Sequence, residues 1–423
     1  GWEKPCPLAV FLLGEWKKGR PVGIWLLSAL PCVLTQQIHI FAGTQCAVCL
    51  CLLVPSGVRR VARKPDCGVS NMNFIKKYVM KNRLVSIIML WILATCACLA
   101  GKKARVVVAY VTSWTDIMPD PWAMTHINYA FGKVNETFDG VNISNPGRLK
   151  KMSELKAVNP KLKILLSVGG WGAGRFSEMA ADEACRKKFA GNCRRLTEEY
   201  GLDGIDIDWE YPTQKSAGIS CSPEDTQNFT LLMRDLRKVL GKKKLLTCAT
   251  IASGEYIDFG NCIKYIDLVN VMTYDMASPP KHHSPLYASD ISGWMTTDAA
   301  VKKHLEKGVP HDKLVVGMPF YGRGLTPYKA YVPRPQVLTG VEEKWSAESQ
   351  VPYMTDKNGN FVLGFENVKS VTAKCHYIIE HDLRGAMYWE YADDYEQGDL
   401  RTAVAQCLLP NEQQGTRGKK ESQ

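Results

Sequence analysis

The segment Leu202–Pro212 (LDGIDIDWEYP) carries acidic side chains at every second position from Asp206 to Glu210. In an extended strand, residues two apart share a face. Asp206, Asp208 and Glu210 would therefore point the same way, while the apolar residues between them point the other way. The apolar face suits contact with covering helices, which leaves three carboxyl groups directed into the interior of a sheet or barrel.

Such a row of interior carboxyl groups is chemically unusual. An unpaired carboxylate loses several kcal/mol of hydration when it is buried, or its pKa rises until it is neutral. We therefore expect the three groups to titrate as a coupled set, with one member protonated near neutral pH and able to act as a general acid. Two alternatives are pairing with distant Lys or Arg side chains and a site for a hard cation. No His or further Asp beside the motif completes a cation site.

The elements that position these groups can be predicted from hydrophobic patterning. Short β-branched runs alternate with amphipathic stretches, which is the pattern of strands separated by helices. The expected strands are 106–111, 126–131, 163–168, 204–209, 245–251, 268–274, 314–320 and 385–389. The clearest expected helices are 183–200, 226–240, 297–307 and 368–381.

Eight strands alternating with helices predict a (β/α)₈ TIM barrel, the α/β fold class, over residues 104–409. A doubly wound open sheet is the alternative, but no Gly-rich phosphate-binding sequence follows any of the strands. The connection between strands 7 and 8 is longer than one loop and helix require. Residues 325–366 are rich in aromatic residues, and we expect a small strand-rich insertion there that walls one side of a cleft.

The charge is unevenly distributed along the 423 residues. The net charge of the chain is +11, yet residues 106–409 hold 35 basic and 37 acidic side chains. The basic excess lies in residues 1–105, with 15 basic and 3 acidic side chains. A near-neutral folded part argues against nucleic acid as a partner. The sequence shows no stable protein partner and no cofactor motif.

The first hundred residues have the pattern of a signal peptide preceded by over-read sequence, and not that of a folded domain. Residues 72–101 have a basic start, the uncharged run 84–99 and then small residues, the order of a secretory signal peptide. A permanent membrane anchor is the alternative. Cys96 follows a sequence similar to a bacterial lipobox, so a lipid anchor at Cys96 or Cys98 would make the exported product a cell-envelope lipoprotein. We interpret residues 1–71 as over-read sequence upstream of Met72, and 410–423 as a flexible tail.

The Cys and His residues give little sign of a metal or disulfide scaffold. Residues 104–409 contain seven cysteines, an odd number, and Cys185 and Cys193 fit buried thiols. The adjacent pair His282 and His283 is expected to be a solvated loop pair. We therefore predict no metal site.

Beyond its own chemistry, the carboxylate segment resembles the signature of glycoside hydrolase family 18, the chitinase family, in its bacterial type. Asp203, Asp206, Asp208 and Glu210 occupy the four acidic positions of the pattern Asp-x-x-Asp-x-Asp-x-Glu. Further motifs similar to those of the family follow in family order: Tyr110 with Trp114, the string Ser167, Val168, Gly169, Gly170, Trp171, the string Met272, Thr273, Tyr274, Asp275, the string from Met318 to Arg323, and Trp389.

The resemblance implies a retaining, substrate-assisted reaction, in which the 2-acetamido oxygen of the sugar attacks its own anomeric carbon. In that reaction Glu210 is the general acid and then the base. Asp208 orients the acetamide, Asp206 shares a proton with Asp208, and Tyr274 donates to the acetamide oxygen. Asp203 and Ser167 support the site. The remaining residues expected to bind substrate are Tyr110, Gly169, Gly170, Trp171, Met272, Asp275, Tyr321, Arg323 and Trp389.

The resemblance also implies the substrate, which is chitin or N-acetylglucosamine oligosaccharides joined by β-1,4 bonds. An endo-β-N-acetylglucosaminidase acting on glycans is one alternative. A non-hydrolytic chitin-binding lectin on the same fold is another, although such relatives typically lose the acid that Glu210 provides here.

Overall fold

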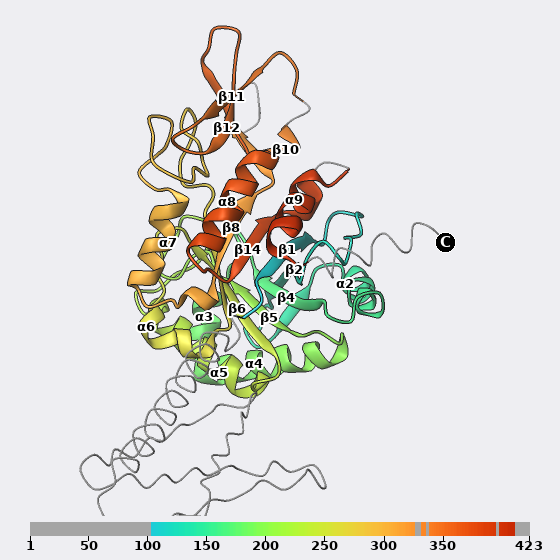
Figure 1. The fold of residues 1–423 in the computed structure, drawn as a ribbon. Coiled ribbons are helices and arrows are strands. Elements are labelled where there is room, and N and C mark those ends of the chain that lie inside the picture. Colours follow the sequence, from blue (N-terminus) through green and yellow to red (C-terminus); the bar gives the residue numbers. More distant parts are fainter. Residues whose placement is uncertain (1–102, 326–330, 336–337, 395–396, 411–423) are drawn as a thin grey trace, which may run out of the picture. The chain divides into compact units, whose positions relative to one another are not determined.

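The computed structural model describes residues 103–325, 331–335, 338–394 and 397–410 (Figure 1). The signal segment and the upstream segment expected from the sequence, together with nearly all of the tail, lie outside these residues. None of the described helices is long and apolar enough to span a membrane.

Eight parallel strands close into a barrel, which confirms the (β/α)₈ fold. The strand order is β1-β14-β8-β7-β6-β5-β4-β2, and pairing of β1 with β2 closes the ring. Each strand expected from the sequence corresponds to one barrel strand. Their bounds are β1 Val106–Thr112, β2 His126–Val134, β4 Lys163–Gly169, β5 Gly204–Asp208, β6 Leu245–Ile251, β7 Leu268–Met272, β8 Leu314–Pro319 and β14 Gly385–Trp389. A short strand, β3 (Val141–Ile143), pairs antiparallel with β2.

Helices lie between the barrel strands along the chain. The α-helices are α2 Pro146–Glu154, α3 Phe176–Ala181, α4 Glu183–Glu199, α5 Asp225–Leu240, α6 Phe259–Cys262, α7 Thr297–Glu306, α8 Val368–Glu380 and α9 Asp399–Leu408. Short 3₁₀ turns are η1 Leu155–Ala157, η2 Ile263–Tyr265, η3 His311–Lys313 and η5 Tyr391–Asp393. The four helices named from the sequence agree with α4, α5, α7 and α8 to within one residue at each end.

The alternation of β5 divides its side chains between two environments, as the sequence predicts. Ile205 and Ile207 are fully buried in the large core that the strands share with the helices. Trp209 follows on the same side and stacks on Phe176 of α3, with ring centroids 5.2 Å apart. Asp206 is equally buried but belongs to the opposite face. The helix layer therefore takes the apolar side chains and leaves the carboxyl groups to the barrel interior.

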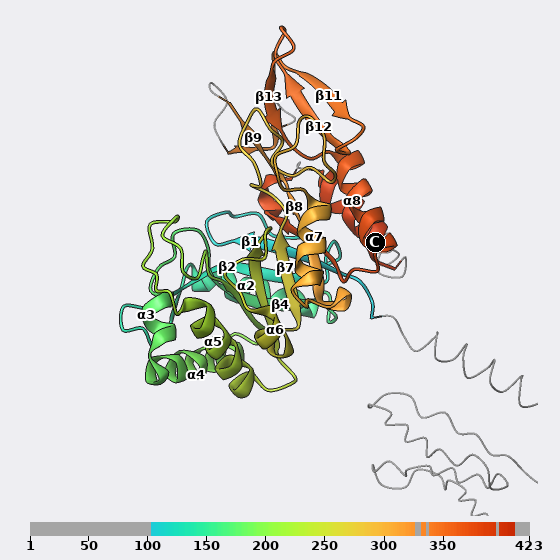
Figure 2. The same ribbon diagram turned by 90° about the vertical axis from the view of Figure 1, so that its left-hand side faces the viewer.

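The insertion between β8 and β14 is a five-stranded antiparallel sheet, ordered β10-β9-β13-β12-β11. It begins four residues before the expected start, because β9 follows β8 almost directly. In Figures 1 and 2 this sheet stands at one end of the barrel, far from α4 and α5. The bounds are β9 Tyr321–Gly324, β10 Val332–Pro333, β11 Glu342–Ser346, β12 Val351–Thr355 and β13 Phe361–Gly364.

Candidate active site

A cavity of about 1040 Å³ opens where the barrel strands end. Its wall includes the last residues of several strands, among them Gly169 of β4, Asp208 of β5 and Met272 of β7. The carboxyl ends of the strands are where TIM barrels carry their active sites. Of the residues predicted from the sequence, those lining the cavity are Tyr110, Gly169, Gly170, Trp171, Asp208, Glu210, Met272, Tyr274, Asp275, Tyr321, Arg323 and Trp389.

Asp206 lies beneath the cavity, with both carboxyl oxygens engaged. Oδ2 accepts hydrogen bonds from Tyr110 Oη and Ser167 Oγ, each at 2.8 Å. Oδ1 accepts from Thr247 Oγ1 at 2.5 Å and from Asn270 Nδ2 at 3.3 Å. Burial raises the pKa of Asp206, although these four donors work to lower it. The donors come from β1, β4, β6 and β7, so the closed barrel is what assembles them.

Asp208 and Glu210 carry the perturbed acidity that the sequence suggests. Burial raises the pKa of Asp208 well above its usual value, and the neighbouring Glu210 and Asp206 raise it further. Oδ1 of Asp208 is buried and has no hydrogen-bond partner among the described residues. Burial also raises the pKa of Glu210 to about 7, against a hydrogen bond with Tyr211 that lowers it. Glu210 therefore carries a proton through much of the neutral range and can act as a general acid.

Tyr274 and Asp275 follow β7 closely along the chain and line the cavity. The Arg323 guanidinium donates two parallel hydrogen bonds to Asp275, from Nε to Oδ1 and from Nη2 to Oδ2, each 2.6 Å long. Burial works to raise the pKa of Asp275, but Arg323 and His283 outweigh it and hold that pKa well below its usual range. Asp275 is therefore an ionised acceptor, whereas burial shifts the pKa of Asp208 and Glu210 in the opposite direction.

Aromatic rings form the apolar part of the cavity wall. Trp389, at the end of β14, stacks on Phe131 with centroids 5.6 Å apart and planes inclined by 17°. Tyr110 and Trp114 pack beside it, at 5.7 and 6.3 Å. Trp171 is 63% exposed and meets Tyr211 edge-on, with ring centroids 6.3 Å apart. Flat apolar faces next to hydrogen-bonding groups suit a sugar ring.

Comparison with known proteins decides the family. Residues 106–394 match the sequence profile of the glycosyl hydrolases family 18. The chain belongs to glycoside hydrolase family 18. Chitinase A1 of Niallia circulans is 32% identical over 337 residues, 67% of this chain and 47% of that protein. Chitotriosidase-1 of Mus musculus is 30% identical over 377 residues, 74% of this chain and 80% of that protein. The chain thus spans about half the length of chitinase A1.

Solved structures of family 18 proteins share the fold. The N-acetylglucosaminidase of Paenibacillus barengoltzii superposes with a TM-score of 0.65 at 34% identity, covering 72% of this chain and all of that one. A group IV chitinase of Ostrinia furnacalis, solved in complex with allosamidin, gives 0.64 at 28% identity over 72% of this chain and 98% of that one. These superpositions agree with the assignment of this chain to family 18.

The glycines of the family 18 string on β4 have a steric role in the cavity wall. Gly169 has φ +134°, and a Cβ there would lie 1.9 Å from the Asp208 carbonyl oxygen. Gly170 has φ +92°, and its Cβ would lie 2.6 Å from the Phe131 ring. Any side chain at these positions would displace Asp208 or Phe131. The pair is therefore required by close packing of the wall beside Trp171.

Two residues predicted at the site support it from outside the cavity. Ser167 is fully buried and holds Asp206, as described above. Asp203 immediately precedes β5, out of phase with the other acidic residues, and pairs with Lys156 Nζ at 2.9 Å. It also accepts a hydrogen bond from the backbone N–H of Ile164 at 3.0 Å. Asp203 thus links β4 to the start of β5 through this hydrogen bond.

The expectation that His282 and His283 are solvated is wrong. Both rings are fully buried, stack at 5.5 Å, and sit between the β7 loop and the insertion sheet. The sequence showed them on a loop, but it did not show that the insertion covers that loop. Within the described ranges, no group of three or more His, Cys, Asp or Glu could hold a metal ion. The seven cysteines there are all free, Cys193 buried and Cys185 partly exposed.

Several cavity residues were not predicted from the sequence. Trp294 is 76% exposed, stands on the long loop after β7 and lines the cavity. Others that line it are Phe131, Tyr211, Glu255, Tyr256 and Tyr331. An aromatic residue shortly after a strand's carboxyl end is a usable signal for Tyr211 and Tyr256. No comparable signal marks Trp294, which is 22 residues past the end of β7.

Proposed function

We propose that this protein hydrolyses β-1,4 bonds between N-acetylglucosamine units, with retention of configuration and with the substrate's acetamide as nucleophile. The observation that carries the proposal is the state of the two carboxyl groups after Asp206. The pKa of Glu210 is raised to about 7, so the protonated acid is present at neutral pH. Asp208 presents a buried oxygen with no hydrogen-bond donor among the described residues. An acetamide N–H is a donor of the right kind for that oxygen.

In this reaction Glu210 protonates the glycosidic oxygen as the bond to the leaving sugar breaks. The acetamide oxygen attacks the anomeric carbon and forms an oxazolinium ion, and Asp208 orients the acetamide and stabilises its positive charge. Glu210, now ionised, removes a proton from the water that opens this ion. Intramolecular attack gains from the high effective concentration of a held nucleophile.

The other side chains would hold the sugar during these steps. We assign Tyr274 as the donor to the acetamide oxygen, with Asp206 sharing the proton of Asp208. Trp389 would form an apolar floor beneath the ring. The ionised Asp275 and its partner Arg323 would bind sugar hydroxyl groups in the cavity, and Trp171 would extend the apolar surface toward solvent.

The substrate is proposed from the site and the relatives together. Both Chitinase A1 and the Ostrinia furnacalis enzyme are named chitinases, and a related enzyme structure from that insect contains a chitin oligosaccharide. The Paenibacillus barengoltzii relative is instead an N-acetylglucosaminidase, so short oligosaccharides are included in the proposal. We also propose that the protein is exported, with residues 72–101 removed as a signal peptide or processed to a lipid anchor. N-terminal sequencing of the mature protein tests this.

Hydrolysis of p-nitrophenyl chitobioside tests the proposed activity. We expect the wild type to turn this substrate over. Glu210→Gln should lower kcat at least 100-fold, which is about the contribution of general acid catalysis. The wild type should not turn over p-nitrophenyl cellobioside, because that substrate lacks the acetamide. Equal rates on the two substrates would refute the substrate-assisted mechanism. Binding of chitin oligosaccharides without hydrolysis by the wild type would favour the lectin alternative.

A further inference from the structure

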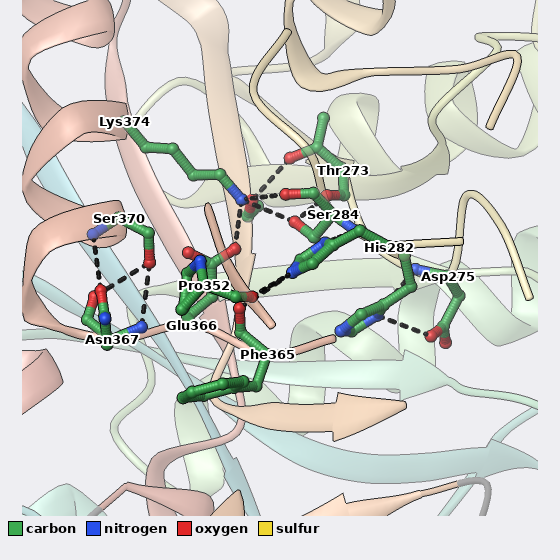
Figure 3. A network of polar contacts seen from close by, with 12 residues as sticks. Thr273, Asp275, His282, Ser284, Pro352, Phe365, Glu366, Asn367, Ser370 and Lys374 are labelled. Carbon is green, nitrogen blue, oxygen red and sulfur yellow. Dashed lines mark hydrogen bonds and ion pairs between the residues drawn. The ribbon is translucent and has the colours of Figure 1, made fainter. Parts of the chain in front are cut away.

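Lys374 of α8 is a fully buried ammonium group. Its Nζ pairs with Glu366 Oε1, and it donates to the carbonyl oxygen of Ser284 at 2.7 Å and to Ser284 Oγ at 2.6 Å (Figure 3). Burial lowers the pKa of Lys374. The carboxylate of Glu366 acts in the opposite direction and raises this pKa, but burial has the larger effect. None of these groups takes part in the proposed reaction, yet together they occupy the space between α8 and the loop after β7.

The hydroxyl of Ser284 transmits this contact to the end of β7. An ammonium group can only donate, so Ser284 Oγ accepts from Lys374, and its own single proton is free to bond elsewhere. That proton goes to the carbonyl oxygen of Thr273, 2.7 Å away. The Thr273 side chain in turn donates to the Gly317 carbonyl of β8 at 2.5 Å. Thr273 is thus held on two sides, and the next two residues are Tyr274 and Asp275.

A second connection joins the same loop to the insertion sheet. His282 Nε2 lies 3.0 Å from the carbonyl oxygens of both Pro352 and Phe365. Carbonyl oxygens only accept, so Nε2 carries the proton, and Nδ1 accepts from the Ser284 N–H at 3.0 Å. Burial, together with His283 and Lys374, keeps the pKa of His282 well below its usual value, so the ring is neutral.

We infer that Ser284 and Lys374 are positioning residues, which set the placement of Tyr274 and Asp275 in the cavity through the Thr273 carbonyl. This inference rests on the proposed function, because it assigns Tyr274 to the acetamide. A buried ion pair is weak as a source of stability, since desolvation offsets most of the attraction. Its contacts, however, are directional, and small displacements of a reacting group can cost up to about 100-fold in rate.

The test is Ser284→Ala, which removes the hydroxyl link and leaves the ion pair intact. We expect kcat on p-nitrophenyl chitobioside to fall about tenfold with little change in KM. Combined with Tyr274→Phe, the same substitution should cost clearly less than in the wild type, because one of the two groups that it positions, the Tyr274 hydroxyl, is already absent. Ser349→Ala is the matched control. Ser349 is also fully buried and its hydroxyl contacts the same loop, at the Tyr287 carbonyl, away from Thr273.

A second variant tests the ammonium group without leaving a buried charge unpaired. Lys374→Met combined with Glu366→Gln removes both charges and should reproduce the loss in kcat seen for Ser284→Ala. Equal losses in the wild-type and Tyr274→Phe backgrounds, or equal losses for Ser284→Ala and Ser349→Ala, would overturn the inference. A wild type inactive on chitobioside would overturn the proposed function itself, whereas an active wild type with an unaffected Ser284→Ala would overturn the positioning role alone.

Discussion

Asp206 and Asp208 stand two residues apart on β5 in opposite hydrogen-bonding states. Asp206 accepts four hydrogen bonds from four different strands, whereas Oδ1 of Asp208 has no partner among the described residues. A buried acceptor without a donor costs about 1–3 kcal/mol. That cost is recovered if a ligand supplies the donor, so the protein without ligand holds an oxygen ready for an incoming N–H group.

The pH dependence of the rate follows from the acid that must be protonated. Burial raises the pKa of Glu210 to about 7. We expect kcat/KM on p-nitrophenyl chitobioside to be lost progressively as pH rises through about 7, because the ionised carboxylate cannot protonate the leaving group. A pH–rate profile measures this. A rate that stays level up to pH 9 would contradict the assignment of Glu210.

The same shift predicts that Glu210 destabilises the fold at high pH. Its folded-state pKa lies above its usual value of 4.5, so its contribution to stability is present below about 4.5 and is lost as pH rises to about 7. Glu210→Gln should therefore be more stable than the wild type at pH 8, by up to about 3 kcal/mol, and equally stable at pH 4. Urea unfolding at both pH values measures the difference; an equal difference at both would contradict the prediction.

Trp171 should serve binding rather than folding. It is 63% exposed, so Trp171→Ala removes little buried contact and should leave the unfolding midpoint unchanged. We expect the KM for chitin hexasaccharide to rise about tenfold, a loss of about 1.4 kcal/mol, with a smaller change for the disaccharide substrate. Trp345→Ala, in the insertion sheet and outside the cavity wall, is the control and should leave both KM values unchanged.

The buried pair of Arg186 and Asp235 should matter for stability alone. Arg186 of α4 donates from Nε to Asp235 Oδ2 of α5 at 3.0 Å, and both side chains are almost fully buried. Asp235 Oδ1 also pairs with Arg234 Nη2 at 2.9 Å. Arg186→Met therefore leaves the carboxylate with one partner, and we expect a loss of about 1–3 kcal/mol in the free energy of unfolding. The exposed helix pair of Arg195 and Glu199 is the control, and Arg195→Ala should cost less than about 1 kcal/mol.

A measurement of kcat shows whether the pair of Arg186 and Asp235 affects the active site. At a temperature where Arg186→Met is fully folded, its kcat should equal that of the wild type, because the pair lies between the outer helices. A reduced kcat in a folded Arg186→Met protein would show that the packing of α4 against α5 affects the cavity.

The sequence by itself determined the strands and the face on which the carboxyl groups lie. The alternation of Asp206 and Asp208 with Ile205 and Ile207 is a local pattern, and local patterns persist whatever the rest of the chain does. The order of eight such strands with helices between them predicted the barrel. The long connection before β14 predicted the insertion, because chain length is also read directly from the sequence.

Only the tertiary structure decided the surroundings of these groups. The donors to Asp206 are 39 to 96 residues away along the chain, and no periodicity relates Tyr110 to Asn270. For the same reason His282 was expected in solvent although the insertion covers it, and Trp294 was not expected in the cavity. Burial, pKa and hydrogen bonding depend on which distant segments meet, and that is set by the closure of the barrel and the folding of the insertion over the β7 loop.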